Sequence, residues 1–163
     1  MIPNPFQRSY EHGVQWVDET DWEYECRFEY SGDLGAELCF ASLDTVADVF
    51  LNDALLGSAD NAFLPYRFPT KQLLQKGTNA LRILFHSSVN TGIARRRKWM
   101  AHHGLPQDIV WFDERAFVRK PAYSFGWDWG PRLVGCGITG EVFLETEPTQ
   151  ELSVQTFPAD GGS

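Results

Sequence analysis

Residues 22–30, WEYECRFEY, decide the fold class of this chain. Aromatic and apolar residues occupy every second position, and three glutamates and one arginine occupy the positions between them. A period of two places the apolar side chains on one face of a β-strand and the charged ones on the other. One strand cannot bury its apolar face alone, so this segment predicts further strands that cover it.

A hairpin is predicted further along, where residues 47–51 and 54–57 flank the pair Asn52-Asp53. Asn and Asp tolerate the positive φ angles that a two-residue hairpin turn requires. Other strand candidates, separated by turn-forming residues, are residues 37–43, 80–86, 109–112, 116–119 and 142–145. This pattern predicts an all-β fold, a jelly-roll β-sandwich with one or two short helical segments.

The helical segments are predicted at two places. Residues 71–77, KQLLQKG, follow Thr70 and have the pattern of one helical turn that ends at Gly77. Residues 90–104, NTGIARRRKWMAHHG, are typical of a longer helix, which Gly104 and Pro106 would end.

Length and charge limit the classes of protein to consider. With 163 residues the chain has room for one domain, and its 43% hydrophobic composition allows a core without disulfide bonds. The net charge of −8 argues against a nucleic-acid partner. Residues 87–132 carry eight Lys or Arg and four Asp or Glu, hence +4, and the remainder carries −12. This basic segment is a candidate docking surface, although its run Arg95–Lys98 is interpreted as a solvated helix face.

No metal, cofactor or membrane partner is predicted. Cys26, Cys39 and Cys136 lack metal-ligand spacing, and the adjacent His102 and His103 would point about 100° apart on a helix. No apolar run approaches the roughly 20 residues that span a bilayer. Sparse cysteines that act as small buried apolar residues favour a reducing compartment, so a cytoplasmic location is preferred while localisation stays open.

Residues 123–133, YSFGWDWGPRL, form the most unusual segment of the chain, with Asp128 between Trp127 and Trp129. Indoles provide flat faces for the C–H side of a pyranose, and a carboxylate accepts hydrogen bonds from two neighbouring sugar hydroxyls. The residues alone leave two interpretations open. One is a sugar site; the other is a structural Asp128 that caps its own loop amides beside two core tryptophans.

Catalytic residues are not expected in this chain. Glycoside hydrolysis usually needs two carboxylates at a defined separation. Asp113 and Glu114 are consecutive, and Asp128 has no evident carboxylate partner. The chain therefore offers no convincing pair of acid and nucleophile.

The segment FVRKPAYSFGWDWGPRL, residues 117–133, closely resembles the signature of β-mannosidases of glycoside hydrolase family 2. Similar segments cover most of the chain: IPNPF, VQWV with DWEY, SLDTVADVFLND, LLGSADNAFLPYRF, GTNALRILFHS and GITGEVFLE. The resemblance implies a galactose-binding-domain-like, sugar-binding jelly roll over residues 1–147 that lacks its first strands. Residues 148–163 would be the start of a truncated immunoglobulin-like domain.

The resemblance also implies an activity. The similar enzymes are retaining exo-glycosidases that hydrolyse terminal, non-reducing β-D-mannose residues with two glutamates of a TIM barrel. Their Trp-Asp-Trp loop contacts the mannose, so Trp127, Asp128 and Trp129 are the expected substrate-binding residues. The expected partners are a β-mannoside oligosaccharide and the immunoglobulin-like and TIM-barrel domains of the same enzyme, without which this chain would be inactive.

Two other functions stay open on the sequence. A free-standing carbohydrate-binding module would use the same aromatic loop without catalysis, and an interaction module would dock through residues 87–132. Absent first strands would also expose a sheet edge, so low stability or aggregation is expected.

Overall fold

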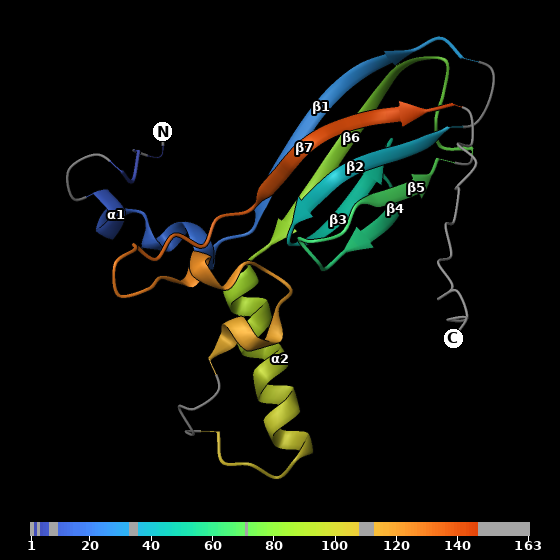
Figure 1. Cartoon of the computed structure of the whole chain (residues 1–163). Helices are drawn as coiled ribbons and strands as arrows, with labels where there is room; N and C mark the ends of the chain where they lie inside the picture. The colour runs from blue at the N-terminus through green and yellow to red at the C-terminus, as the bar shows by residue number, and fades with distance from the viewer. Residues whose placement is uncertain are drawn as a thin grey trace, which may run out of the picture.

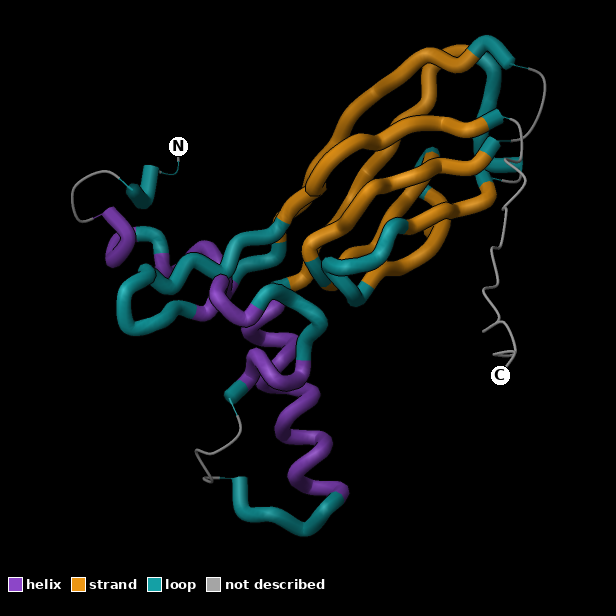
Figure 2. Tube along the Cα trace, viewed as in Figure 1, coloured by secondary structure: helices purple, strands orange, loops and turns teal. Residues whose placement is uncertain are grey.

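Seven strands form two antiparallel sheets in the computed structural model, which describes residues 2, 4–6, 10–32, 36–70, 72–107 and 113–146. The strands are β1 (Trp22–Tyr30), β2 (Glu37–Asp44), β3 (Val46–Leu51), β4 (Ala54–Ala59), β5 (Tyr66–Pro69), β6 (Gly77–His86) and β7 (Gly137–Glu145). One sheet has the order β1-β6-β3-β4 and the other β5-β2-β7. Figures 1 and 2 show the sheets as two facing layers, which confirms the predicted sandwich.

The core lies between the inward faces of the two sheets. Phe40 of β2 and Ile83 and Phe85 of β6 are at most 1% exposed. On β7, Leu144 lies opposite the buried Leu38 and packs against the same cluster. Each large apolar side chain buried in this way stabilises the fold by about 1.5–3 kcal/mol.

The predicted hairpin is confirmed between β3 and β4. Asn52 and Asp53 have φ angles of 50° and 65°, the left-handed region that a two-residue turn needs. The Asn52 side chain also accepts a hydrogen bond from the Ala80 amide (2.9 Å) and donates one to the Leu73 carbonyl (2.7 Å). The turn is therefore fastened to the neighbouring strand.

The predicted helical turn over residues 71–77 is wrong. Residues 72–76, the described part before β6, contain a turn and no helix. The Asn79 side chain accepts a hydrogen bond from the Gln75 amide (2.9 Å) and donates one to the Gln75 carbonyl (2.7 Å). Because the side-chain amide of Asn79 binds the backbone N–H and C=O of Gln75, these two groups do not form the hydrogen bonds of a helix.

The predicted strand over residues 116–119 is also wrong. The 3₁₀ helix η2 (Glu114–Phe117) occupies the first half of this stretch, and the Asp113 carboxylate caps it by accepting from the Arg115 amide at 2.9 Å. A local side-chain cap outweighs a weak strand pattern here. The strand expected at residues 109–112 lies outside the described residues.

The predicted helix over residues 90–104 is confirmed as α2, which begins earlier. The helices of the described ranges are α1 (Tyr10–Gly13), η1 (Gln15–Glu19), α2 (Ser88–His102), η2 and η3 (Ala122–Phe125). The Ser87 hydroxyl caps α2 by accepting from the Asn90 amide (3.0 Å), and Gly104 follows the helix with φ +65°. Figure 1 shows that α2 projects away from the sandwich. None of these described helices is long and apolar enough to cross a membrane.

The sandwich is open along β1 and β7, each of which has one strand neighbour in the described part. Tyr24 and Cys26 lie on the inward face of β1, since their partners on β6 are core residues, yet Tyr24 is 44% exposed and Cys26 is exposed too. Val142 of β7 lies opposite a core residue of β2 and is 39% exposed. The prediction that the cysteines are buried is therefore wrong for Cys26.

We expect this seam to drive self-association of the 163-residue chain, because free strand edges beside uncovered apolar side chains pair with other chains. Val142→Lys adds an inward charge at the seam and should increase the monomer fraction in analytical ultracentrifugation. The control is Phe143→Lys, on the opposite face of the same strand. Equal suppression of association by the two variants would contradict the seam as the site.

His86, the last residue of β6, contacts two carboxylates. Its Nε2 lies 2.8 Å from Asp48 Oδ2 on β3, and its Nδ1 lies 3.5 Å from Asp21 Oδ2. The hydrogen bond to Asp48 raises the pKa of His86 above its usual range. The hydrogen bond from Ser58, and to a smaller extent the one with His86, lowers the pKa of Asp48. The ion pair thus links β6 to β3 just before the helix begins.

The stability that this pair contributes should depend on pH. The raised pKa of His86 stabilises the fold below the usual histidine value of about 6.5, and this contribution is lost as pH rises through the raised value. The lowered pKa of Asp48 stabilises the fold above about 3.9, and that contribution is lost on acidification. His86→Gln should therefore lower the Tm more at pH 5.5 than at pH 8.5. His12→Gln, at an exposed histidine, is the control; a pH-independent effect of His86→Gln would contradict the pair.

Candidate functional site

The unusual aromatic segment forms a loop between η2 and β7. It begins with η3, follows residues 126–135, and then enters β7. Figures 1 and 2 show this loop beside α1 and η1, at the end of the sandwich from which α2 projects. The three predicted site residues, Trp127, Asp128 and Trp129, lie together at its tip.

Backbone hydrogen bonds close the tip into a small hairpin. The Trp127 amide donates to the Gly130 carbonyl (3.2 Å), and the Gly130 amide donates to the Trp127 carbonyl (3.1 Å). Asp128 and Trp129 are therefore the two central residues of the turn. Nearer the base, the Leu133 amide donates to the Ser124 carbonyl at 3.0 Å. These three bonds give the loop a defined shape without using any side chain of the tip.

Asp128 projects from this turn into solvent. Its carboxylate is exposed and makes no hydrogen bond or ion pair with any residue in the described ranges. The structural interpretation required Asp128 to cap its own loop amides, and the geometry does not contain that cap. The carboxylate keeps its full capacity to accept hydrogen bonds from a ligand.

The flanking tryptophans are surface residues. Trp127 is 60% and Trp129 is 84% exposed, so neither belongs to the core as the structural interpretation required. Both border an open cavity of about 300 Å³. The other residues that line it are Phe6, Tyr123, Ser124, Gly130, Pro131 and Leu133, and Asp128 is not among the lining residues. The wall is thus mainly aromatic and apolar, with the carboxylate beside it.

A buried lysine fixes the base of the loop. Lys120 is 5% exposed, and its ammonium group lies 2.5 Å from Asp44 Oδ2 and 2.8 Å from the Gly135 carbonyl oxygen. Asp44 ends β2, and Gly135 precedes β7. Lys120 therefore ties the start of the loop both to its end and to the sandwich.

Sequence reasoning missed two aromatic residues of the cavity. Tyr123 is 73% exposed and Phe6 is 78% exposed. Tyr123 belongs to the same aromatic segment, so its composition was an available signal. Phe6 is more than 100 residues away in the sequence, and no local pattern indicated that it meets the loop.

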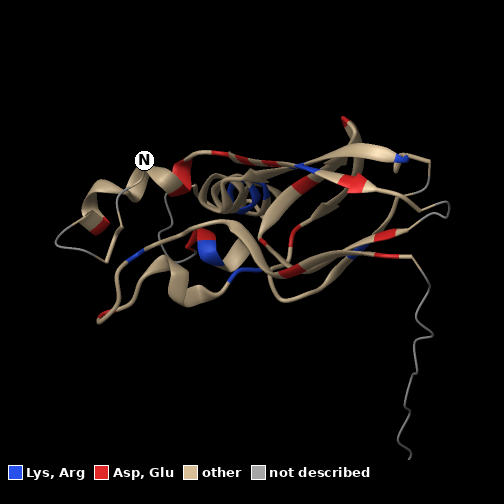
Figure 3. Cartoon of the chain, turned by 90° about the horizontal axis from the view of Figure 1, so that it is seen from above, with Lys and Arg blue, Asp and Glu red and all other residues tan. Residues whose placement is uncertain are grey.

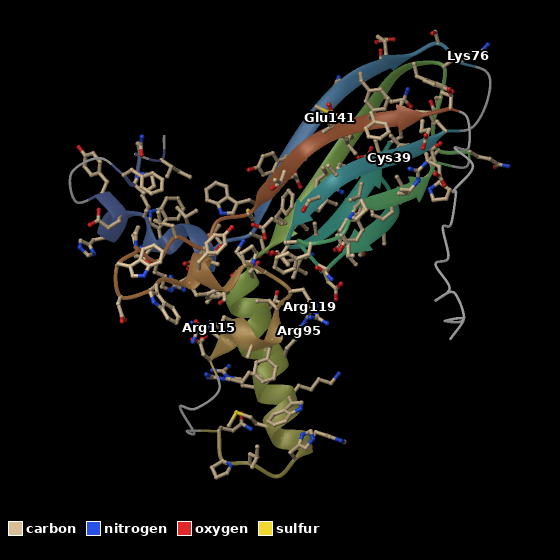
Figure 4. All side chains as sticks on the ribbon, viewed as in Figure 1. Cys39, Lys76, Arg95, Arg115, Arg119 and Glu141 are labelled. Carbon is tan, nitrogen blue, oxygen red and sulfur yellow. The ribbon has the colours of Figure 1, made fainter. Side chains whose placement is uncertain are left out.

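The basic segment predicted over residues 87–132 contains α2, η2 and η3. Figure 3 shows Lys and Arg gathered on this helix, and Figure 4 shows Arg95, Arg115 and Arg119 near it. Arg95 donates to the Phe117 carbonyl (3.3 Å) and lies 3.6 Å from the Asp60 carboxylate. Arg115 pairs with Asp113 at 3.1 Å. Part of this positive charge therefore supports the packing of α2 against its own neighbours.

One group of side chains has the donor atoms for a metal ion. Glu37, Cys39 and Glu145 bring ligand atoms within 4.8 Å of one another on β2 and β7, and Figure 4 labels Cys39. The Arg67 guanidinium pairs with both glutamates, at 2.9 Å for Glu37. Burial raises the pKa of the Cys39 thiol, which disfavours the thiolate that a metal binds. Glu37, Arg67 and Glu145 accordingly form an ion-paired network beside the buried Cys39 thiol.

The two facing sheets and the exposed aromatic loop define a jelly-roll domain of the galactose-binding type. The chain belongs to the glycosyl hydrolase 2 galactose-binding domain-like family, whose model matches residues 1–140. It is similar to beta-mannosidase B of Thermothelomyces thermophilus, with 37% identity over 153 residues that cover 89% of this chain and 17% of that protein. Beta-mannosidase of Mus musculus is 27% identical over 166 residues, 96% of this chain and 19% of that protein.

A solved structure supports the same relationship. The crystal structure of beta-D-mannosidase from Dictyoglomus thermophilum matches with a TM-score of 0.75 and 32% identity, over 93% of this chain and 20% of that one. These matches confirm the resemblance to β-mannosidases of glycoside hydrolase family 2. The chain corresponds to the N-terminal domain of that family and spans about a fifth of the length of these relatives.

Removing the Lys120 ammonium should destabilise the domain strongly. Lys120→Met leaves the Asp44 carboxylate and the Gly135 carbonyl without their partner, which typically costs about 3–5 kcal/mol for a buried pair. Urea unfolding followed by circular dichroism measures the loss, and Lys98→Met on the exposed part of α2 is the control. The double variant Lys120→Met/Asp44→Asn should recover part of the loss; no recovery would contradict the ion pair as its origin.

Proposed function

We propose that this chain is the substrate-contacting domain of a β-mannosidase, a retaining exo-glycosidase that hydrolyses terminal, non-reducing β-D-mannose residues. The observation that carries the proposal is Asp128, an exposed carboxylate without a partner among the described residues, between two exposed indoles on a closed hairpin. Membership of the glycosyl hydrolase 2 family and similarity to proteins named beta-mannosidase support the choice of sugar.

The side chains of the tip have complementary roles in this proposal. Asp128 accepts hydrogen bonds from two neighbouring hydroxyls of the mannose, and each bond to a charged group contributes about 1.5–3 kcal/mol. Trp127 and Trp129 contact the apolar C–H surface of the pyranose. A site that pairs particular hydroxyls discriminates against sugars that present them differently, so the loop supplies specificity.

The chemical step belongs to other domains of the same protein. Two glutamates of a TIM barrel, one as acid/base and one as nucleophile, carry out retaining hydrolysis in this proposal. The immunoglobulin-like and barrel domains are accordingly the partners of this chain, and residues 148–163 are the start of the first of them. On its own the chain binds or shapes the substrate without hydrolysing it.

Loss of the Asp128 charge should reduce the activity of the full-length protein. In Asp128→Asn the isosteric amide replaces the charged acceptor, so kcat/KM for an aryl β-mannoside should fall by about 10- to 100-fold, equivalent to about 1.5–3 kcal/mol. The matched control is Asp53→Asn, which removes the charge of another exposed turn aspartate at the Asn52-Asp53 hairpin.

The outcome separates two functions. Unchanged kinetics of Asp128→Asn would remove Asp128 from the sugar site. Absence of β-mannosidase activity from the wild-type full-length protein, together with mannose binding by the 163-residue chain, would instead indicate a carbohydrate-binding module. Half a pocket binds a monosaccharide with a Kd near 1 mM, about −4 kcal/mol, so isothermal titration needs millimolar ligand.

A further inference from the structure

The aromatic loop is held from outside by a segment more than 100 residues away in the sequence. Gln15 Nε2 donates to the Arg132 carbonyl oxygen (2.8 Å), and the Arg132 guanidinium donates to Gln15 Oε1 (3.0 Å). The same guanidinium nitrogen also donates to Asp18 Oδ2. Gln15 and Asp18 both belong to η1. One short helix therefore holds both the backbone and the side chain of Arg132.

Arg132 is well placed to transmit this constraint to the tip. Pro131, with its restricted φ angle, is the only residue between Arg132 and Gly130, which closes the tip hairpin. On the other arm of the loop, Gly126 has φ +91°, and a Cβ atom there would lie 3.1 Å from the Arg132 Cβ. Arg132 thus lies on one arm of the loop and close to Gly126 on the other, just below Trp127, Asp128 and Trp129.

The burial of Asp18 lowers the stability of the fold more than a purely structural contact requires. It is 7% exposed, and burial raises its pKa although the Arg132 charge acts in the opposite direction. Its second oxygen, Oδ1, has no hydrogen-bond partner. Burying a charged oxygen without a partner costs stability, and an apolar side chain in this place would avoid that cost. We infer that Asp18 is present at this position because it fixes the position of the Arg132 guanidinium.

We propose that Gln15 and Asp18 are positioning residues, which hold Arg132 and through it fix the orientation of Asp128 and its two flanking tryptophans. The orienting role rests on the contacts described above. Its consequence for sugar recognition rests on the proposed function. A loop backbone that is already held in place has less conformational freedom to lose when the sugar binds, so the constraint favours binding.

The test uses the full-length protein and two readouts. The first is hydrogen–deuterium exchange of residues 122–135, which requires no substrate. Asp18→Ala should accelerate exchange in this segment by about fivefold or more, because the loop opens locally once Arg132 is released. The second is a double-mutant cycle between Asp18 and Asp128 in kcat/KM for an aryl β-mannoside.

In the cycle, Asp18→Ala should reduce kcat/KM by about tenfold in the wild-type background and by less than twofold when Asp128 is already alanine. A merely structural loss would reduce activity equally in both backgrounds. Asp18→Asn keeps an acceptor for Arg132 and should restore most of the activity. The control for loss of an arginine ion pair elsewhere is Glu23→Gln, which removes a carboxylate on β1 that lies 3.0 Å from Arg82 on β6.

Each result decides the inference. Unchanged exchange in residues 122–135, or additive losses in the cycle, would overturn it. If the wild-type protein does not hydrolyse β-mannosides, the proposed function fails, and the exchange measurement alone decides the positioning role. If Asp18→Ala does not fold, Gln15→Ala is used instead. It removes two of the three contacts with Arg132 and does not change a buried charge. Its hydrogen–deuterium exchange and its double-mutant cycle with Asp128→Ala are judged by the same criteria.

Discussion

The buried ammonium of Lys120 is the contact on which the candidate site depends. A lysine withdrawn from water is tolerated only with good partners, and here these are Asp44 at the end of β2 and Gly135, two residues before β7. Asp44 belongs to the sheet β5-β2-β7, and Gly135 leads into its strand β7, so Lys120 fastens the base of the loop to that sheet. Functional side chains on a loop are precise when rigid elements hold its ends, and Lys120 provides this at the base.

The domain combines a well-packed centre with an uncovered side. Around Phe40 and Phe85 the two layers exclude solvent, whereas Tyr24 and Cys26 of β1 and Val142 of β7 remain accessible on the inward face. Natural sandwiches avoid such edges or cover them with other parts of the chain. The aromatic loop lies at one end of the sandwich and the open seam along its side, so site and seam are different surfaces.

Much of the fold was predictable because it depends on patterns that are local in the sequence. The alternation over residues 22–30 and the Asn52-Asp53 turn encode β1 and the β3–β4 hairpin directly. The errors at residues 71–77 and 116–119 arose where one side chain, Asn79 or Asp113, bonds to nearby backbone groups. Such a bond is worth as much as a weak propensity and leaves no periodic signal.

The candidate site could be located from the sequence, whereas the contacts that support it could not. The composition of residues 123–133 singled out Asp128 and its two indoles as candidates, and it left a sugar site and a structural role both open. The contacts of Lys120 with Asp44 and of Arg132 with Gln15 and Asp18 span 76 to 117 positions of the sequence. Pairings at such separations follow from the topology of the folded chain, which no short motif records. The exposure of Cys26 likewise depends on which strands meet, since its alternation pattern is that of a buried residue.

The positions of these supporting contacts in the sequence determine whether the loop can be transferred to another protein. Residues 120–135 contain every side chain that lines the cavity except that of Phe6, which suggests a loop that could be transferred to another scaffold. Yet the loop takes its shape from Asp44 at its base and from η1 beside Arg132. A graft of the loop alone would carry the recognition chemistry without its orientation. The transferable unit is three separate pieces of sequence, which come together only on a jelly roll that presents all of them at the same end.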